Sequence, residues 1–215
     1  MKARIHALPD VGAIVRFHDA ALPRQHGGDD DTDHHDHADV VWRAIRANHH
    51  HNRLLWDEED RARRTDVGAE TIAASKRAID RHNQLRNDAV EAIDEALLTR
   101  LSAPPSAGAR LSSETAGAMI DRLSILALKI FHMRAQAQRA EAGAAHMAAC
   151  AARLERLTAQ RDDLAACLDR LLSEAASGAA CFKVYRQFKM YNDPALNPWL
   201  YGRPATTANE PGGGP

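Results

Sequence analysis

The first long segment with helical periodicity, residues 38–64, carries polar side chains on its apolar face. These polar residues are its main candidates for binding or catalysis. Apolar residues such as Val41, Trp42 and Ile45 recur on one stripe at about 100° per residue. The same stripe holds a second set of residues able to bind or react: Asn48, His49, Asn52, Trp56, Glu59, Asp60 and Arg63. A buried charge costs several kcal/mol unless it is paired and hydrogen-bonded, so this pattern needs an explanation.

The next two helical patterns are interrupted in the same way. On the face defined by apolar residues such as Ile79 and Ile93, the interrupting residues are Asn83 and Arg86, with Asn87 and Asp94 beside them. The following helix is apolar nearly all round, which is typical of a central, buried helix. It nevertheless carries Asp121, Lys129 and His132.

Two interpretations of these polar residues remain open. The first is a structural network of ion pairs and amides that fixes how the helices pack, or helix edges that face solvent. The second is a ligand or catalytic pocket in the bundle core, where facing helices commonly build sites. Pattern breaks on three helices together favour a functional site.

The residue types suggest roles in such a pocket. His132 and His49 are the candidate general acids or bases near neutral pH, and Asp121 is expected to orient a nearby imidazole. Arg86 and Arg63 can hold a carboxylate or phosphate through two donors. The remaining candidates are amides suited to hydroxyl groups, as in a sugar or nucleotide: Asn48, Asn52, Asn83 and Asn87.

A basic and aromatic segment, residues 182–191, differs from the rest of the chain. Its candidates for binding a phosphate or a negatively charged partner are Lys183, Arg186 and Lys189. The alternative is a C-terminal helix that docks through its rings and leaves these charges in solvent.

The pattern of the whole chain predicts an all-α fold, an antiparallel bundle of five to six helices. The expected helices span residues 10–22, 38–64, 66–101, 112–138, 144–177 and 181–191. Asp10, Asp66 and the pair Ser112 and Ser113 are the expected N-terminal caps, and Gly178 the expected C-terminal stop. No alternating strand pattern is present. We expect one domain over residues 1–202 and a disordered tail over residues 203–215.

A polar segment rich in Asp and His, residues 23–38, interrupts this domain. It lacks defined ligand spacing, so we expect a solvated insert with weak, adventitious metal binding. Deletion of residues 27–39 is expected to leave the fold and activity intact. The chain has no Gly-rich phosphate loop and no Cys-x-x-Cys pair, so we expect neither a metal site nor a cofactor.

Composition limits the class of protein. The formal net charge of -1 argues against a dedicated nucleic-acid binder. No apolar run approaches the length of a membrane span, and the first 22 residues lack the core of a secretory signal. The three cysteines show no paired spacing, which fits a reducing compartment. We therefore expect a cytoplasmic protein, whose oligomeric state the sequence leaves open.

One family resemblance covers most of the chain. The residues that carry it are Asn48, Asn52, Leu55, Trp56, Glu59, Asp60, Ala62, Arg63, Lys76, Arg77, Ile79, Asp80, Asn83, Gln84, Arg86, Asn87, Asp88, Glu91, Ile93, Asp94 and the segments 113–115, 120–126, 128–130, 132–133 and 182–193. Together they resemble the bacterial domain of unknown function 4254. That family is often encoded among genes for lipopolysaccharide and other surface glycans, and it has no established catalytic residues. The chain departs from it at Ala116, where proline is usual, and in the Asp/His insert.

The resulting hypothesis is an enzyme or ligand-binding protein for an anionic, hydroxyl-rich small molecule in surface-glycan assembly. A sugar phosphate or a nucleotide sugar fits this description. The alternative is a non-catalytic scaffold that partners a glycosyltransferase or a similar glycan-assembly enzyme. A weaker alternative is a helical ribonuclease of the HEPN group, because Arg77 and His82 have that group's spacing.

Overall fold

The computed structural model describes residues 7–22, 38–101, 103–188, 193 and 195–198. The chain divides into two units, residues 1–185 and residues 186–215. The described part of the first unit is an all-α bundle, as predicted. Its elements are α1 (Val11–Ala20), α2 (Val40–Ala62), α3 (Ala69–Arg100), β1 (Arg110–Leu111), α4 (Ala116–Ala137), the 3-10 turn η1 (Ala140–Ala142), α5 (Ala144–Ala176) and β2 (Ala180–Cys181).

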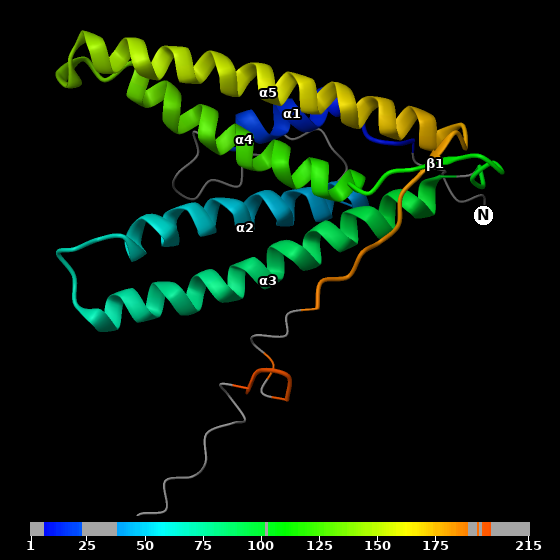
Figure 1. Cartoon of the computed structure of the whole chain (residues 1–215), viewed down its shortest axis with the longest axis horizontal. Helices are drawn as coiled ribbons and strands as arrows, with labels where there is room; N and C mark the ends of the chain where they lie inside the picture. The colour runs from blue at the N-terminus through cyan, green and yellow to red at the C-terminus, as the bar shows by residue number, and fades with distance from the viewer. Residues whose placement is uncertain (1–6, 23–37, 102, 189–192, 194, 199–215) are drawn as a thin grey trace, which may run out of the picture. The chain divides into compact units, whose positions relative to one another are not determined.

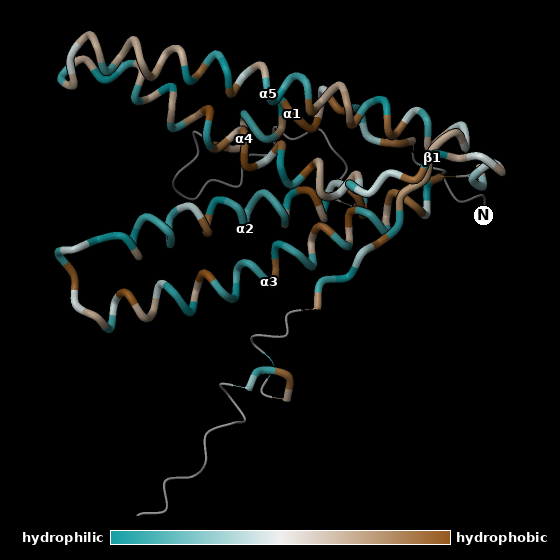
Figure 2. The backbone as a smooth tube through the Cα atoms, viewed as in Figure 1, coloured by the Kyte–Doolittle hydropathy of each residue, from teal (hydrophilic) through white to brown (hydrophobic). Residues whose placement is uncertain are grey.

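The first unit is built from two helical hairpins (Figure 1). Helices α2 and α3 form one hairpin and α4 and α5 form the other, and α1 contacts both α4 and α5. The hairpins meet through α4, which packs on α2 and α3. Hydrophilic residues are frequent along α2 and α3 (Figure 2). The apolar core therefore gathers around α4, and its most buried side chains include Ile45, Ile93, Leu97, Ile120 and Leu168.

Two of the predicted caps are confirmed and two are wrong. Asp10 caps α1 by accepting a hydrogen bond from the Ala13 amide at 2.7 Å, and Gly178 follows α5 with a φ of 77°. Asp66 instead pairs with Arg64, and α3 begins after Gly68. The cap of α4 is Thr115, whose hydroxyl accepts from the Ala118 amide at 3.1 Å. Ser112 donates its hydroxyl to the Glu114 carbonyl, so the serine pair precedes the helix rather than capping it.

The predicted sixth helix is wrong over its described part. Ala180 and Cys181 form β2, which pairs in parallel with β1, and residues 182–188 are irregular. Ladder hydrogen bonds join Arg110 to Ala179 at 2.9 Å and Ser112 to Cys181 at 2.8 Å. This pairing uses the backbone groups that a first helical turn at residue 181 would need. A two-residue strand is too short to show an alternating pattern in the sequence.

Other predictions fall outside the described residues. These are most of the polar insert, up to residue 37, and the tail at residues 203–215.

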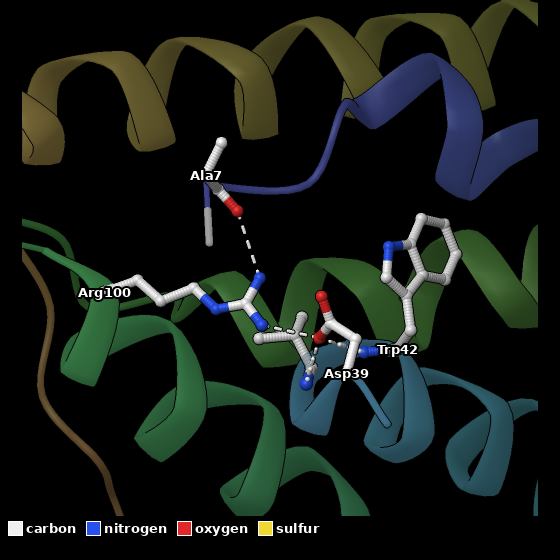
Figure 3. A network of polar contacts seen from close by, with 5 residues as sticks. Ala7, Asp39, Trp42 and Arg100 are labelled. Atoms are coloured by element: carbon white, nitrogen blue, oxygen red, sulfur yellow. Dashed lines mark hydrogen bonds and ion pairs between the residues drawn. The ribbon is translucent and has the colours of Figure 1, made fainter. Parts of the chain in front are cut away.

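A buried ion pair ties three parts of the first unit together (Figure 3). Asp39 caps α2 by accepting from the amides of Val41 and Trp42 at 2.8 and 3.2 Å. Its carboxylate also accepts from Arg100, at the end of α3, at 2.5 Å. Arg100 in turn donates to the Ala7 carbonyl at 3.0 Å. Burial alone would raise the pKa of Asp39, but the Arg100 and backbone hydrogen bonds outweigh it and lower that pKa.

Asp39 therefore sets the boundary of the segment that can be removed. Deletion of residues 27–37, bridged by a short Gly/Ser linker, should leave the melting temperature nearly unchanged. The matched variant Asp39→Ala removes a cap and strands a half-buried guanidinium, which costs about 3 kcal/mol or more. Chemical denaturation of both proteins measures the difference. Equal loss of stability in the two would contradict this placement of the boundary.

Candidate functional site

A buried polar seam joins α2 to α4. Asn48 and Asn52, one turn apart on α2, both donate from Nδ2 to Oδ1 of Asp121, at 2.8 and 2.9 Å. Asn52 Nδ2 also donates to Ser124 Oγ at 3.0 Å and lies 3.3 Å from Asn48 Oδ1. Asn48 and Ser124 are completely buried and Asn52 is 4% exposed. The sequence-based candidates Asn48, Asn52 and Asp121 thus form one connected network.

Two stacked histidines extend this seam into the core. His49 Nδ1 lies 2.8 Å from Ser124 Oγ, and the His49 ring stacks on His18 of α1 with centroids 4.9 Å apart. Both ring nitrogens of His18 and Nε2 of His49 are buried without a hydrogen-bond partner. Sequence reasoning missed His18. The available signal was its place on the same helical face as Val11 and Ile14.

Burial keeps both histidines neutral. It lowers the pKa of His49 to about 4, with Arg53 and His50 adding to the shift. Burial also lowers the pKa of His18 well below its usual value, and His49 contributes. The predicted acid–base role of His49 is not favoured, because this ring is 2% exposed and lines neither of the two cavities described below.

A cavity of about 450 Å³ lies between α2, α3 and α4. Its lining contains seven of the sequence-based candidates: Asn52, Trp56, Glu59, Asp60, Arg63, Asn83 and Arg86. Leu55, Ile125 and Leu128 complete the lining. The structure therefore brings together residues from two helices that the sequence could only group helix by helix.

Two arginines with different surroundings line this cavity. Arg63 is paired with Glu59 at 3.0 Å and also donates to the Glu59 carbonyl at 2.7 Å. Arg86 donates from Nη2 to Asn87 Oδ1 at 3.1 Å, while its Nε is buried and has no hydrogen-bond partner. An unsatisfied buried donor costs about 1–3 kcal/mol. Arg86 thus lines the cavity with a guanidinium group whose Nε no described protein group satisfies.

A second cavity, of about 360 Å³, shares Trp56, Asp60 and Leu128 with the first. Its other lining residues are Leu22, Arg53, Asp57, Arg61, Phe131 and His132. His132 stacks on Trp56 with the ring centroids 4.4 Å apart and the planes 2° from parallel. Burial lowers the pKa of His132, against the opposing effect of the Asp60 and Asp57 carboxylates. The sequence did not single out Arg53, Asp57 and Arg61, because they lie beside the apolar stripe of α2.

The sequence predicts that Asp121 orients a nearby imidazole, but His132, on the same helix, is out of its reach. The two residues share a face of α4, but eleven residues at 1.5 Å each separate them by about 16 Å along the axis. Asp121 is engaged by Asn48 and Asn52, and His132 by Trp56.

Of the remaining candidates, those described in the first unit line neither cavity. Asp94 is buried and accepts from the Gly117 amide at 2.6 Å, and burial raises its pKa to about 6 against hydrogen bonds from Thr115 and Gly117. Asn87 accepts a hydrogen bond from Arg86 Nη2 through its Oδ1. The others are Lys129 and Lys183, both exposed, Arg186, in the second unit, and Lys189, outside the described residues.

The described residues contain no group of three or more His, Cys, Asp or Glu side chains placed to hold a metal ion. Among the described helices, none is long and apolar enough to cross a membrane.

The described part of the first unit is thus an all-helical bundle with a cavity between its two hairpins that both polar and apolar side chains line. The sequence matches the family described as "Protein of unknown function (DUF4254)" over residues 42–184, and the chain belongs to this family. The match includes every lining residue of both cavities except Leu22 and ends before residues 185–193. No curated protein and no solved structure matches the chain.

The buried histidines predict acid sensitivity. Because the pKa of His49 falls to about 4 on folding, the unfolded chain binds more protons below pH 6.5, and stability falls as the pH falls. Between pH 7 and pH 4 this histidine alone should remove roughly 3 kcal/mol from the free energy of unfolding. His49→Gln should make the decline smaller by that amount, whereas His50→Gln, at an exposed neighbouring position that adds only part of the shift, should change it much less. Urea denaturation at several pH values measures this, and identical pH profiles for all three proteins would refute it.

Proposed function

We propose that this protein binds an anionic, hydroxyl-rich small molecule, a sugar phosphate or a nucleotide sugar, in the cavity between α2, α3 and α4. The observation that carries the proposal is Arg86, a cavity-lining residue whose guanidinium group has an Nε without a hydrogen-bond partner. A phosphate or carboxylate oxygen is the natural acceptor for a guanidinium donor.

The rest of the lining supports a ligand with hydroxyl groups. Asn52 and Asn83 bring amides, and Glu59 and Asp60 bring carboxylates that can accept from hydroxyls. Trp56 supplies a flat apolar wall held in place by His132. A volume of about 450 Å³ lies within the usual range of small-molecule sites.

The biological setting that we propose is surface-glycan assembly in the bacterial cytoplasm. It rests on the family resemblance and on the absence of a membrane-spanning helix among the described residues. Catalysis is part of the proposal only through His132, which lines the second cavity beside Asp57 and Asp60.

The alternative function is a scaffold for a glycan-assembly enzyme. A scaffold would favour a broad exposed apolar surface. The exposed large apolar residues of the described first unit lie instead on separate elements: Val40 on α2, Leu85 on α3, Leu111 on β1 and Tyr185 after β2. A cavity with several polar lining residues, together with scattered exposed apolar residues, favours the ligand-binding function.

A thermal-shift screen against sugar phosphates, nucleotides and nucleotide sugars tests the proposal. A compound present at 100 times its Kd should stabilise the protein by roughly 2.7 kcal/mol. Arg86→Gln should weaken binding about tenfold or more, because a hydrogen bond to a charged group contributes about 1.5–3 kcal/mol. The matched control is Arg77→Gln, at an exposed position of the same helix, which should bind like the wild type. A panel without any stabilising anion, or unchanged binding by Arg86→Gln, would rule the proposal out.

A further inference from the structure

The seam between α2 and α4 fixes which atom of Asn52 faces the cavity. A side-chain amide has two N–H donors on Nδ2 and one acceptor, Oδ1. In Asn52, Nδ2 is directed toward α4, where Asp121 Oδ1 and Ser124 Oγ accept its hydrogens at 2.9 and 3.0 Å. Asn52 also lines the cavity of about 450 Å³. The polar atom left for that cavity is Oδ1.

Asp121 prevents the amide from turning over. An ionised carboxylate only accepts hydrogen bonds, so a flipped Asn52 would place Oδ1 against Oδ1 of Asp121. Asn48 adds to this constraint. Its own Nδ2 donates to Asp121 at 2.8 Å, which leaves Asn48 Oδ1 directed at Asn52 Nδ2, 3.3 Å away. Both asparagines are therefore oriented by the same carboxylate.

We infer that Asn52 Oδ1 is a fixed hydrogen-bond acceptor in the binding cavity and that Asp121 is the positioning residue that holds it so. The ligand must then carry a donor, a hydroxyl group, on the same face as the anionic group that Arg86 binds. This inference rests on the proposed function and narrows it. The ligand class is a phosphate or carboxylate that also carries a hydroxyl group, and anions without one should bind more weakly.

The selectivity follows from the cost of burying an acceptor without a partner. Asn52 is 4% exposed, so a ligand that covers Oδ1 without donating to it removes the little hydration that this atom has. Sites built to bond a hydroxyl reject analogues that lack it far more strongly than apolar pockets reject an extra methylene. For a single neutral acceptor we expect a discrimination of about tenfold or more.

Isothermal titration calorimetry with three probes tests the inference: inorganic phosphate, glycerol 3-phosphate and propyl phosphate. The last two have equal carbon chains and differ in their hydroxyl groups. The wild type should bind glycerol 3-phosphate about tenfold or more tightly than propyl phosphate. In Asp121→Asn, which is nearly isosteric, Asn52 is free to turn, and the ratio should fall toward one. The affinity for inorganic phosphate should change little, which a general loss of structure would not produce.

Two further variants keep the outcome interpretable. Ser124→Ala removes the other acceptor of Asn52 Nδ2 but leaves Asp121 in place, so the ratio should be retained. Asn52→Ala should still bind phosphate but should no longer prefer glycerol 3-phosphate over propyl phosphate. This variant replaces Asp121→Asn in the test if Asp121→Asn does not fold. The inference is overturned if the wild type binds both esters with equal affinity, or if Asn52→Ala keeps the full preference for glycerol 3-phosphate. Either result leaves the proposed anion site at Arg86 intact. Failure of all three probes to bind overturns the proposed function and the inference together.

Discussion

The arrangement of the site depends on one carboxylate, Asp121, which sits where the two helical hairpins meet. It accepts hydrogen bonds from two asparagines of the opposite hairpin. Carboxylates at such half-buried positions are usually paired with a cation, whereas this one is held by neutral amides. Those amides are thereby locked in a single orientation. The contact thus joins α2 to α4 and also decides what α2 presents to the cavity.

The packing of α3 against α4 explains why a cavity exists next to this contact. At one end the two helices approach so closely that a Cβ on Gly117 would lie 2.5 Å from the Val90 carbonyl oxygen. Toward the other end, at Asn83, Arg86 and Ile125, large side chains face one another and leave about 450 Å³ between them. The close approach joins α3 to α4 at this end, and the Asp39–Arg100 pair joins α2 to α3. The polar lining occupies the part that remains open.

Much of the cavity lining could be predicted from the sequence because helical periodicity assigns residues to faces. Asn52, Trp56, Glu59 and Arg63 follow at spacings of three or four, so they share one side of α2 whatever the tertiary fold. The same rule could not assign partners. It could not show which imidazole, if any, lies near Asp121, and it gave no sign that His18 would stack on His49.

The wrong local predictions have a common physical cause, which is competition between partners. Aspartate is a residue type favoured at helix N-caps, but the Asp66 carboxylate forms an ion pair with Arg64 at 2.7 Å. Residues 181–188 have helix-compatible composition, yet the pairing of β2 with β1 takes up the backbone groups first. In each case the group that the local preference assigned to a cap or a helical turn has another partner.

A crystal structure of the protein with its most stabilising sugar phosphate would show directly whether the seam and the cavity form one ligand site. The phosphate should lie within hydrogen-bond distance of the Arg86 guanidinium, and a ligand hydroxyl should donate to Asn52 Oδ1, with Asp121 still accepting from both asparagines. A ligand bound elsewhere, with the cavity filled by water and Arg86 Nε hydrated, would contradict this arrangement.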